Sequence, residues 1–192
     1  MTVAINGTDL ISLADFKTLA EITSSQHDSK LTELIDSVSQ LVKTYCGNSI
    51  IDFYTSDKTE EITINFGTNQ VQLTESPVNN IDSVQERATE TASYDTLTAD
   101  TDYVLDKATD ILYRLGGNVF PRGINSVKVV YNAGYSATPA DLKLAVADLV
   151  THYLRGEHKE RRTIQGATIQ NQRSDITFPD HIKRVLDLYK TY

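Results

Sequence analysis

The stretch VVYNAGYSATPADLKLA, residues 129–145, joins a β-like run to a strongly signalled helix start. Gly134 can adopt backbone angles that are closed to other residues, so the strand can turn sharply there. Thr138 can accept hydrogen bonds from the first free amides of a helix, Pro139 suits the first helical position, and Asp141 completes a capping-box pattern. The stretch therefore predicts a stiff corner between a sheet and a core helix.

Helical periodicity extends to both sides of this corner. The helix that follows it is predicted over residues 139–155, where apolar residues recur at the spacing of one helix face. Two earlier helices are predicted over residues 12–22 and 29–46, and Gly47 stands where a left-handed C-terminal cap belongs. A short last helix begins at Pro179. The sequence thus predicts a core of helices from both ends of the chain.

Between residues 48 and 132 the apolar period changes to two, which is typical of strands. The alternation predicts a first hairpin over 62–73, a weaker strand around 81–85, a second hairpin over 102–115 and a last strand from 127. The expected fold class is α+β: a helical core with an inserted antiparallel β-hairpin region and a C-terminal arm ending in a short helix.

Composition describes an ordinary globular chain. Of the 192 residues, 40% are hydrophobic and 23% are charged. No apolar run approaches the roughly 20 residues of a membrane helix, and the start MTVAINGTDLIS lacks the basic segment and apolar core of a signal peptide. We therefore expect neither a membrane partner nor secretion by that route. Cys46 is the only cysteine, which excludes an internal disulfide and leaves a packing residue or a reactive thiol.

The formal charge of −8 is unevenly spread along the chain. From residue 155 to 192 there are eight Lys/Arg against five Asp/Glu, whereas acids dominate from 75 to 110. The nine acids of that stretch, set against Arg87 and Lys107, are Glu75, Asp82, Glu86, Glu90, Asp95, Asp100, Asp102, Asp106 and Asp110. The asymmetry indicates either complementary surfaces for self-association or two solvated faces.

The sequence contains no recognisable motif for catalysis or cofactor binding. The histidines lack metal-ligand spacing, no Gly-rich phosphate loop precedes a helix, and Ser136 is not part of a GxSxG elbow. The sequence therefore predicts no catalytic residue, metal site or cofactor, although a carboxylate pair among the acidic loops leaves a small soluble enzyme as an alternative. The basic cluster RGEHKERR, residues 155–162, also contains two glutamates. We interpret it either as a polar helix end or as a phosphate contact.

The ordered series of segments resembles the head–tail connector proteins of tailed bacteriophages, also called adaptor or head completion proteins, in their longer form. The segments that carry the resemblance are Tyr45-Cys46-Gly47, LTESPV at 73–78, Tyr103-Val104-Leu105-Asp106, the stretch 127–154, and Phe178-Pro179 before the closing helix. The resemblance spans most of the chain.

Such a resemblance implies a virion structural protein without a catalytic site or cofactor. It implies a ring, commonly of twelve subunits, that lies beneath the portal at the head–tail interface and extends the DNA channel. The implied partners are the portal protein, a stopper or tail-completion protein, and DNA that passes without specific binding; assembly takes place in the host cytoplasm. Residues 1–162 are then the adaptor core, and residues 163–192 an arm that docks on the portal.

Candidate site residues follow from this interpretation. Side chains at element ends are the expected interface positions: Tyr135, Arg155, Arg161, Arg162, Phe178 and Tyr189. Tyr135 is equally compatible with a core position. The acids expected to face the channel or a neighbouring subunit are Glu86, Glu90, Asp95, Asp100 and Asp102. The alternative within the same particle is another neck, tail-completion or capsid-decorating protein, and a gene-transfer particle or defective prophage would use the same part.

Overall fold

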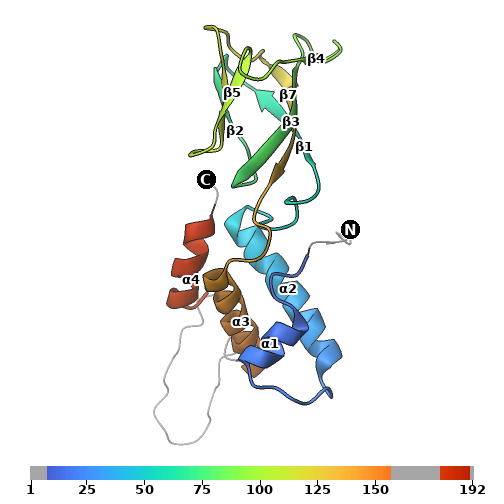
Figure 1. Cartoon of the computed structure of the whole chain (residues 1–192), viewed down its shortest axis with the longest axis vertical. Coiled ribbons are helices and arrows are strands. Elements are labelled where there is room, and N and C mark those ends of the chain that lie inside the picture. Colours follow the sequence, from blue (N-terminus) through green and yellow to red (C-terminus); the bar gives the residue numbers. More distant parts are fainter. Residues whose placement is uncertain (1–7, 157–177, 191–192) are drawn as a thin grey trace, which may run out of the picture. The chain divides into compact units, whose positions relative to one another are not determined.

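Residues 8–156 and 178–190 are described by the computed structural model of the chain (Figure 1). The chain divides into two units. The helical unit combines the described residues up to Cys46 with those from Thr138 to Lys190, and the β unit covers Gly47–Ala137. The β unit is therefore inserted between helices, as the sequence predicts.

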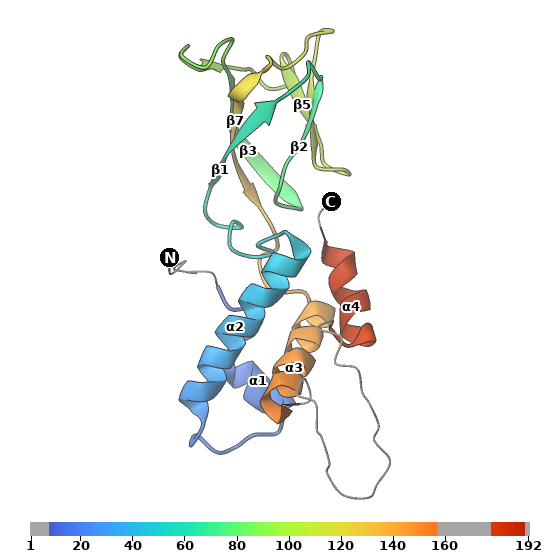
Figure 2. The ribbon, with the colours of Figure 1, turned by 180° about the vertical axis from the view of Figure 1, so that it is seen from behind.

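The helical unit is built from α1 (Leu13–Leu19), α2 (Asp28–Cys46), α3 (Ala140–Arg155) and α4 (Asp180–Leu186), with the 3₁₀ turn η1 (Asp187–Tyr189). Helix α3 lies between α2 and α4 when the unit is seen from the front and from behind (Figures 1 and 2). Apolar side chains from every helix meet inside the unit. The buried set includes Phe16, Leu31, Ile35, Val38, Val42, Leu142, Val146, Leu149, Val150, Ile182 and Leu186.

The helix boundaries follow local backbone chemistry. Ser12 Oγ accepts a hydrogen bond of 3.1 Å from the Asp15 amide and caps α1, as predicted. Helix α1 ends at Leu19, earlier than expected, and Glu21 follows with a left-handed φ of 54°. The prediction of a Thr138 cap on α3 is wrong, because Pro139 is itself the N-cap with extended angles and no side-chain cap bond.

The β unit contains β1 (Lys58–Ile64), β2 (Gln70–Gln72), β3 (Val78–Glu86), β4 (Asp95–Thr96), β5 (Tyr103–Asp106), β6 (Ile111–Arg114) and β7 (Gly123–Ala133). Within residues 47–137 the strands form a four-stranded sheet, β1-β7-β3-β4, and a three-stranded sheet, β2-β6-β5, both antiparallel. The two sheets share one hydrophobic core. Its fully buried members include Leu73, Val84, Leu112, Phe120, Val127, Val129 and Tyr131.

Strand pairing departs from the sequence prediction at the first hairpin. Ile62 on β1 pairs with Val127 on β7, and Val71 on β2 pairs with Leu112 on β6, so the two halves of the predicted 62–73 hairpin lie in different sheets. The long strand β7 pairs with β1 along one edge and with β3 along the other. The second predicted hairpin is confirmed as β5 and β6, with Asp106 opposite Ile111.

Gly134 forms the predicted corner at the end of β7. Its φ is 99°, a region that L side chains rarely adopt. A Cβ at this position would stand 2.3 Å from the Ile50 carbonyl oxygen, which instead accepts a 2.8 Å hydrogen bond from the Tyr135 amide. The Gly134 carbonyl also accepts a bond of 2.8 Å from Asn79 Nδ2. Both the turn and the close backbone approach therefore require glycine.

Candidate functional site

Helix α4 is anchored in the helical unit by its apolar side. Ile182 and Leu186 are buried, and the Cys46 thiol at the end of α2 lies 3.6 Å from the Leu186 carbonyl oxygen. Burial, and to a smaller degree the Asp187 carboxylate, raise the pKa of Cys46 to about 11. These contacts support the interpretation of Cys46 as a packing residue.

Aromatic side chains fasten the two ends of this C-terminal segment. The Tyr45 hydroxyl donates a 2.6 Å hydrogen bond to Asp187 Oδ1, and the Tyr45 ring meets the Phe178 ring edge-on with centroids 4.9 Å apart. The Tyr189 hydroxyl donates a 2.7 Å bond to Asp141 Oδ1, and this bond is the main cause of a lowered pKa at Asp141. The expected interface residues Phe178 and Tyr189 thus attach α4 to α2 and α3.

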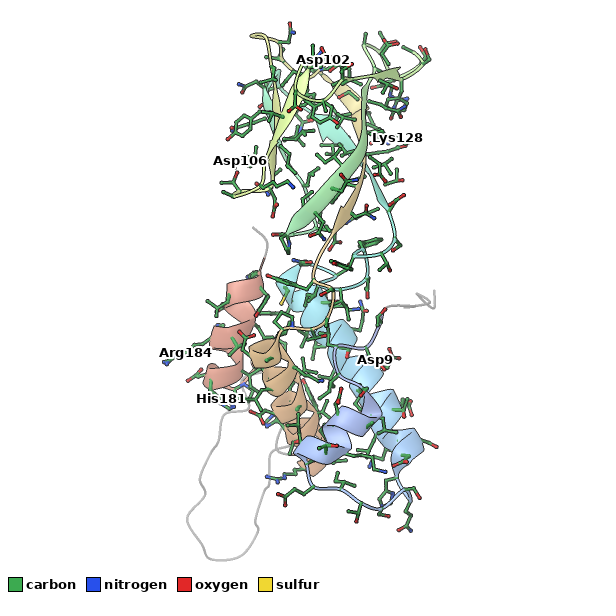
Figure 3. All side chains as sticks on the ribbon, in the orientation of Figure 1. Asp9, Asp102, Asp106, Lys128, His181 and Arg184 are labelled. Atoms are coloured by element: carbon green, nitrogen blue, oxygen red, sulfur yellow. The ribbon has the colours of Figure 1, made fainter. Side chains whose placement is uncertain are left out.

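The side of α4 that points away from α2 and α3 carries the set that we call the basic face: His181, Arg184 and Leu188. Figure 3 shows His181 and Arg184 on this outward side. All three are exposed, and Leu188 retains 77% of its accessible surface. Neither His181 nor Arg184 has a side-chain hydrogen bond or ion pair with any residue that the structure describes. Asp180 and Asp187 border the face, and Asp187 is bonded to Tyr45.

On the other side of the helical unit lies what we call the acidic face: Asp9, Glu33 and Asp36. Glu33 and Asp36 are exposed on the outward side of α2, and Asp9 is half-buried in the segment before α1. Burial and the nearby Asp36 charge raise the pKa of Asp9, and the Lys43 ammonium offsets part of this effect. Carboxylates therefore crowd this surface, and Glu33 and Asp36 have no ion-pair partner in the described parts of the chain.

Of the remaining interface candidates, the structure describes Tyr135 and Arg155, and each lies at the end of an element. Tyr135 follows β7 and is half-buried, while Arg155 is the exposed last residue of α3. Arg161 and Arg162 lie outside the described residues.

Two of the acids expected to face a channel or neighbour are engaged within the β unit. Arg114 on β6 forms ion pairs with Glu86 on β3 at 3.1 Å and with Asp102 at 3.4 Å. Asp102 also accepts a 2.9 Å bond from the Thr98 amide, the main cause of its lowered pKa, with Arg114 contributing less. Figure 3 shows Asp102 and Asp106 in this part of the β unit. Glu90, Asp95 and Asp100 are exposed.

Two further acids of this stretch are buried, which the sequence does not indicate. Glu75 accepts bonds from the Ser49 amide at 2.7 Å and from Lys58 Nζ at 2.8 Å. Asp110 accepts bonds from Ser76 Oγ at 2.6 Å and from the Val78 amide at 2.9 Å. These carboxylates hold loops of the β unit in place.

Side chains in the described parts of the chain offer few arrangements suited to catalysis or ligand binding. Over residues 8–156 and 178–190, no group of three or more His, Cys, Asp or Glu side chains is placed to hold a metal ion. A shallow depression of about 430 Å³ beside residues 88–91 is lined by one carboxylate, Glu90, and one guanidinium, Arg122. None of the helices in these ranges is long and apolar enough to cross a membrane.

The fold is that of an α+β protein of two units, in which polar side chains of the described residues form structural hydrogen bonds and ion pairs. Residues 9–192 match the model of the head completion protein family, and the chain belongs to this family. The family predicted from the sequence is thereby confirmed, and with it the predicted class of role, a structural component of the head–tail connection of the virion.

Known relatives agree with this assignment. The head completion protein of Escherichia phage T5 is 31% identical over 70 residues, which cover 36% of this chain and 41% of that protein. The matched region thus spans about two fifths of the length of this relative.

Solved structures share the fold of the chain. A protein in the neck of a native gene transfer agent particle with C12 symmetry is 18% identical, with a TM-score of 0.59 over 100% of this chain and 93% of that one. A protein in the neck of an empty gene transfer agent particle with C6 symmetry is 16% identical, with a TM-score of 0.62 over 95% of this chain and 90% of that one. These similarities support the predicted α+β fold class.

Proposed function

We propose that the chain forms a ring beneath the portal, connects the phage head to the tail and extends the DNA channel. The observation that carries the proposal is the family match, which runs from residue 9 to residue 192 and so includes both units. The similarity in fold to proteins of necks with C6 and C12 symmetry supports a ring, which we expect to hold twelve subunits. The chemistry proposed is assembly, without a catalytic step.

Net charge suits a channel that DNA must cross. The chain carries a formal charge of −8, so a ring of copies repels phosphates unless basic side chains are concentrated on the lumen. DNA then passes without being held. We place the exposed carboxylates of Glu90, Asp95 and Asp100 against the lumen or a neighbouring subunit. Glu86 and Asp102 share that surface role in our proposal while Arg114 fixes their position.

Portal docking is assigned to residues 163–192, with Arg161 and Arg162 at the base of this arm. Helix α4 and the turn η1, within it, are attached to α2 and α3 by the hydrogen bonds of Tyr45 with Asp187 and of Tyr189 with Asp141. A stopper or tail-completion protein docks on the opposite opening of the ring. Arg155 and Tyr135 remain the interface positions proposed outside the arm.

The proposal is tested by negative-stain microscopy and native mass spectrometry of the purified chain, alone and mixed with the portal protein of the same particle. We expect the portal to gain an additional ring whose mass gives the number of subunits. A chain that ignores the portal and binds the tail tube or the capsid shell would instead be a different component of the particle. A monomer that binds none of these would overturn the proposal.

A variant tests the arm separately. Replacing Arg161 and Arg162 with alanine is expected to weaken portal binding, and thermal unfolding verifies that the double variant is folded. The matched control is Arg122→Ala, which removes an exposed arginine of the β unit. Equal portal binding by the double variant and the control would exclude the two arginines from the docking surface.

A further inference from the structure

The helical unit presents opposite charges on opposite sides. Helix α3 lies between α2 and α4 in both views of the ribbon (Figures 1 and 2). Asp9 on the acidic face and Arg184 on the basic face lie on opposite sides of the unit in Figure 3. Residues 8–46 contain six Asp/Glu against three lysines, whereas Lys183, Arg184 and Lys190 outnumber the two aspartates of residues 178–190.

We propose that the basic face of one copy, His181, Arg184 and Leu188, binds the acidic face of the next copy, Asp9, Glu33 and Asp36. The partner is thus a second copy of this chain, and the contact joins neighbours around the ring, while portal docking falls to the other residues of the 163–192 arm. This inference rests on the proposed function, since it assigns the surfaces by which that ring closes.

Symmetry favours a contact between unlike faces. A two-fold contact would place each face against its own copy and bring like charges together, which costs free energy. A head-to-tail contact instead pairs the guanidinium of Arg184 with the carboxylates of Glu33 and Asp36. Two different faces that meet in this way generate a closed ring when the rotation between copies closes. Faces on opposite sides of one compact unit have the arrangement that such a contact needs.

An exposed apolar group lies within the basic face. Leu188 is 77% exposed. Contact between copies covers this leucine and removes water from around the charges, which strengthens the ion pairs. An apolar centre with charged surroundings is the usual composition of a specific interface.

Charges on the two faces that are unpaired within the described residues also support this contact between copies. Arg184 has no ion-pair partner within the described residues of its own chain, and neither has Asp36. The pKa of Asp9 is raised chiefly by burial and then by repulsion from the Asp36 carboxylate, and the Lys43 ammonium offsets part of this effect. A guanidinium from the neighbouring copy neutralises this surface. The Tyr45 and Tyr189 hydrogen bonds already hold the C-terminal segment in place, so little conformational entropy is lost on binding.

Charge reversal tests the pairing in the full-length chain. Arg184→Glu and Asp36→Arg are each expected to raise the protein concentration at half-assembly by about tenfold or more, because attraction becomes repulsion. The double variant restores the opposite signs and is expected to assemble as the wild type does. Assembly is measured by native mass spectrometry and negative stain, both alone and on the portal. Thermal unfolding verifies that each variant is folded.

The matched control is Lys107→Glu, which makes the same change of charge at an exposed position in the β5–β6 turn and is expected to leave assembly unchanged. If the wild type forms rings and both single variants assemble equally well, the two faces do not meet although the connector role stands. Impaired single variants without rescue in the double variant would also overturn the pairing. A wild type that forms no ring, even on the portal, would overturn the proposed function itself.

Discussion

The hydroxyl of Tyr189 donates a 2.7 Å hydrogen bond to the carboxylate of Asp141 and so ties η1 to the first turn of α3. The two residues are separated by 48 positions in the sequence. Because Asp141 is exposed, solvent reduces the contribution of this bond to roughly 0.5 kcal/mol. Its importance is positional: it fixes the segment that carries the basic face.

We predict that Tyr189→Phe raises the pKa of Asp141 toward its ordinary value, since the Tyr189 bond is the main cause of the lowering. A carboxyl group with a lowered pKa in the folded state stabilises the fold above its unfolded pKa, and this contribution is lost as the pH falls through the folded pKa. ¹³C NMR titration of the Asp141 carboxyl carbon measures the shift. If the titration curve of Asp141 is unchanged in the variant, the Tyr189 hydrogen bond is not the cause of the lowered pKa.

The helices were predictable from sequence because their signals are local. Helix α2 was expected over 29–46 and spans Asp28–Cys46, since the apolar spacing and Gly47 lie within the segment itself. The strand pairs were not predictable in the same way. Lys58 pairs with Tyr131 across 73 positions of sequence, and alternation along β1 says nothing about which strand it joins.

Site residues were only partly predictable. Phe178 and Tyr189 were expected at an interface; the structure shows their contacts with Tyr45 and Asp141 within the chain, and contact with another protein stays a prediction. The basic face was missed, although the sequence holds a signal for it. The apolar stripe of the last helix is Ile182, Val185, Leu186 and Tyr189, and Leu188 falls outside it, where an exposed position is expected.

Replacing Gly134 with alanine is expected to destabilise the protein by more than about 3 kcal/mol, because the new Cβ would stand 2.3 Å from a backbone oxygen in a strained conformation. The control is Gly117→Ala, where φ is 74° and no heavy atom lies within 4 Å of the added Cβ. That change should cost only the conformational strain, roughly 1–2 kcal/mol. Guanidinium unfolding followed by circular dichroism compares them, and equal losses would contradict the role assigned to close backbone contact.

Arg114→Met is expected to loosen the β unit. The Arg114 side chain is 9% exposed and the Glu86 side chain 18% exposed, so removal of the guanidinium leaves a largely buried carboxylate without its partner. We expect a loss of about 1–3 kcal/mol in the free energy of unfolding. Arg122→Met, at an exposed position, should change stability by less than about 0.5 kcal/mol. A similar effect of both substitutions would show that the ion pair contributes nothing specific.

Tyr131→Phe removes a hydroxyl that connects strand β7 with its surroundings. This fully buried group donates a 2.6 Å bond to Glu60 Oε2 and accepts a 3.2 Å bond from the Glu75 amide. Its removal should cost about 1–3 kcal/mol, because both partners lose a hydrogen bond in a largely buried site. Tyr113→Phe serves as the control, since the Tyr113 hydroxyl has no partner within the described residues. Chemical denaturation of both variants decides whether this network stabilises the β unit.

Cys46 reports whether α4 stays in place. Burial raises the pKa of its thiol from 9.0 to about 11, so at pH 8 the thiolate is roughly a hundredfold scarcer than for the unshifted group. We expect a thiol reagent to label Cys46 at least about a hundredfold more slowly in the native protein than in guanidinium. The raised pKa lowers the amount of thiolate, and burial also shields the sulfur from the reagent. In a Cys46→Ala background, Val119→Cys supplies a thiol at a position that is 54% exposed as the control and should react at an ordinary rate. Fast native labelling of Cys46 would mean that α4 leaves α2 frequently, and the basic face would then lack the fixed position that a ring contact requires.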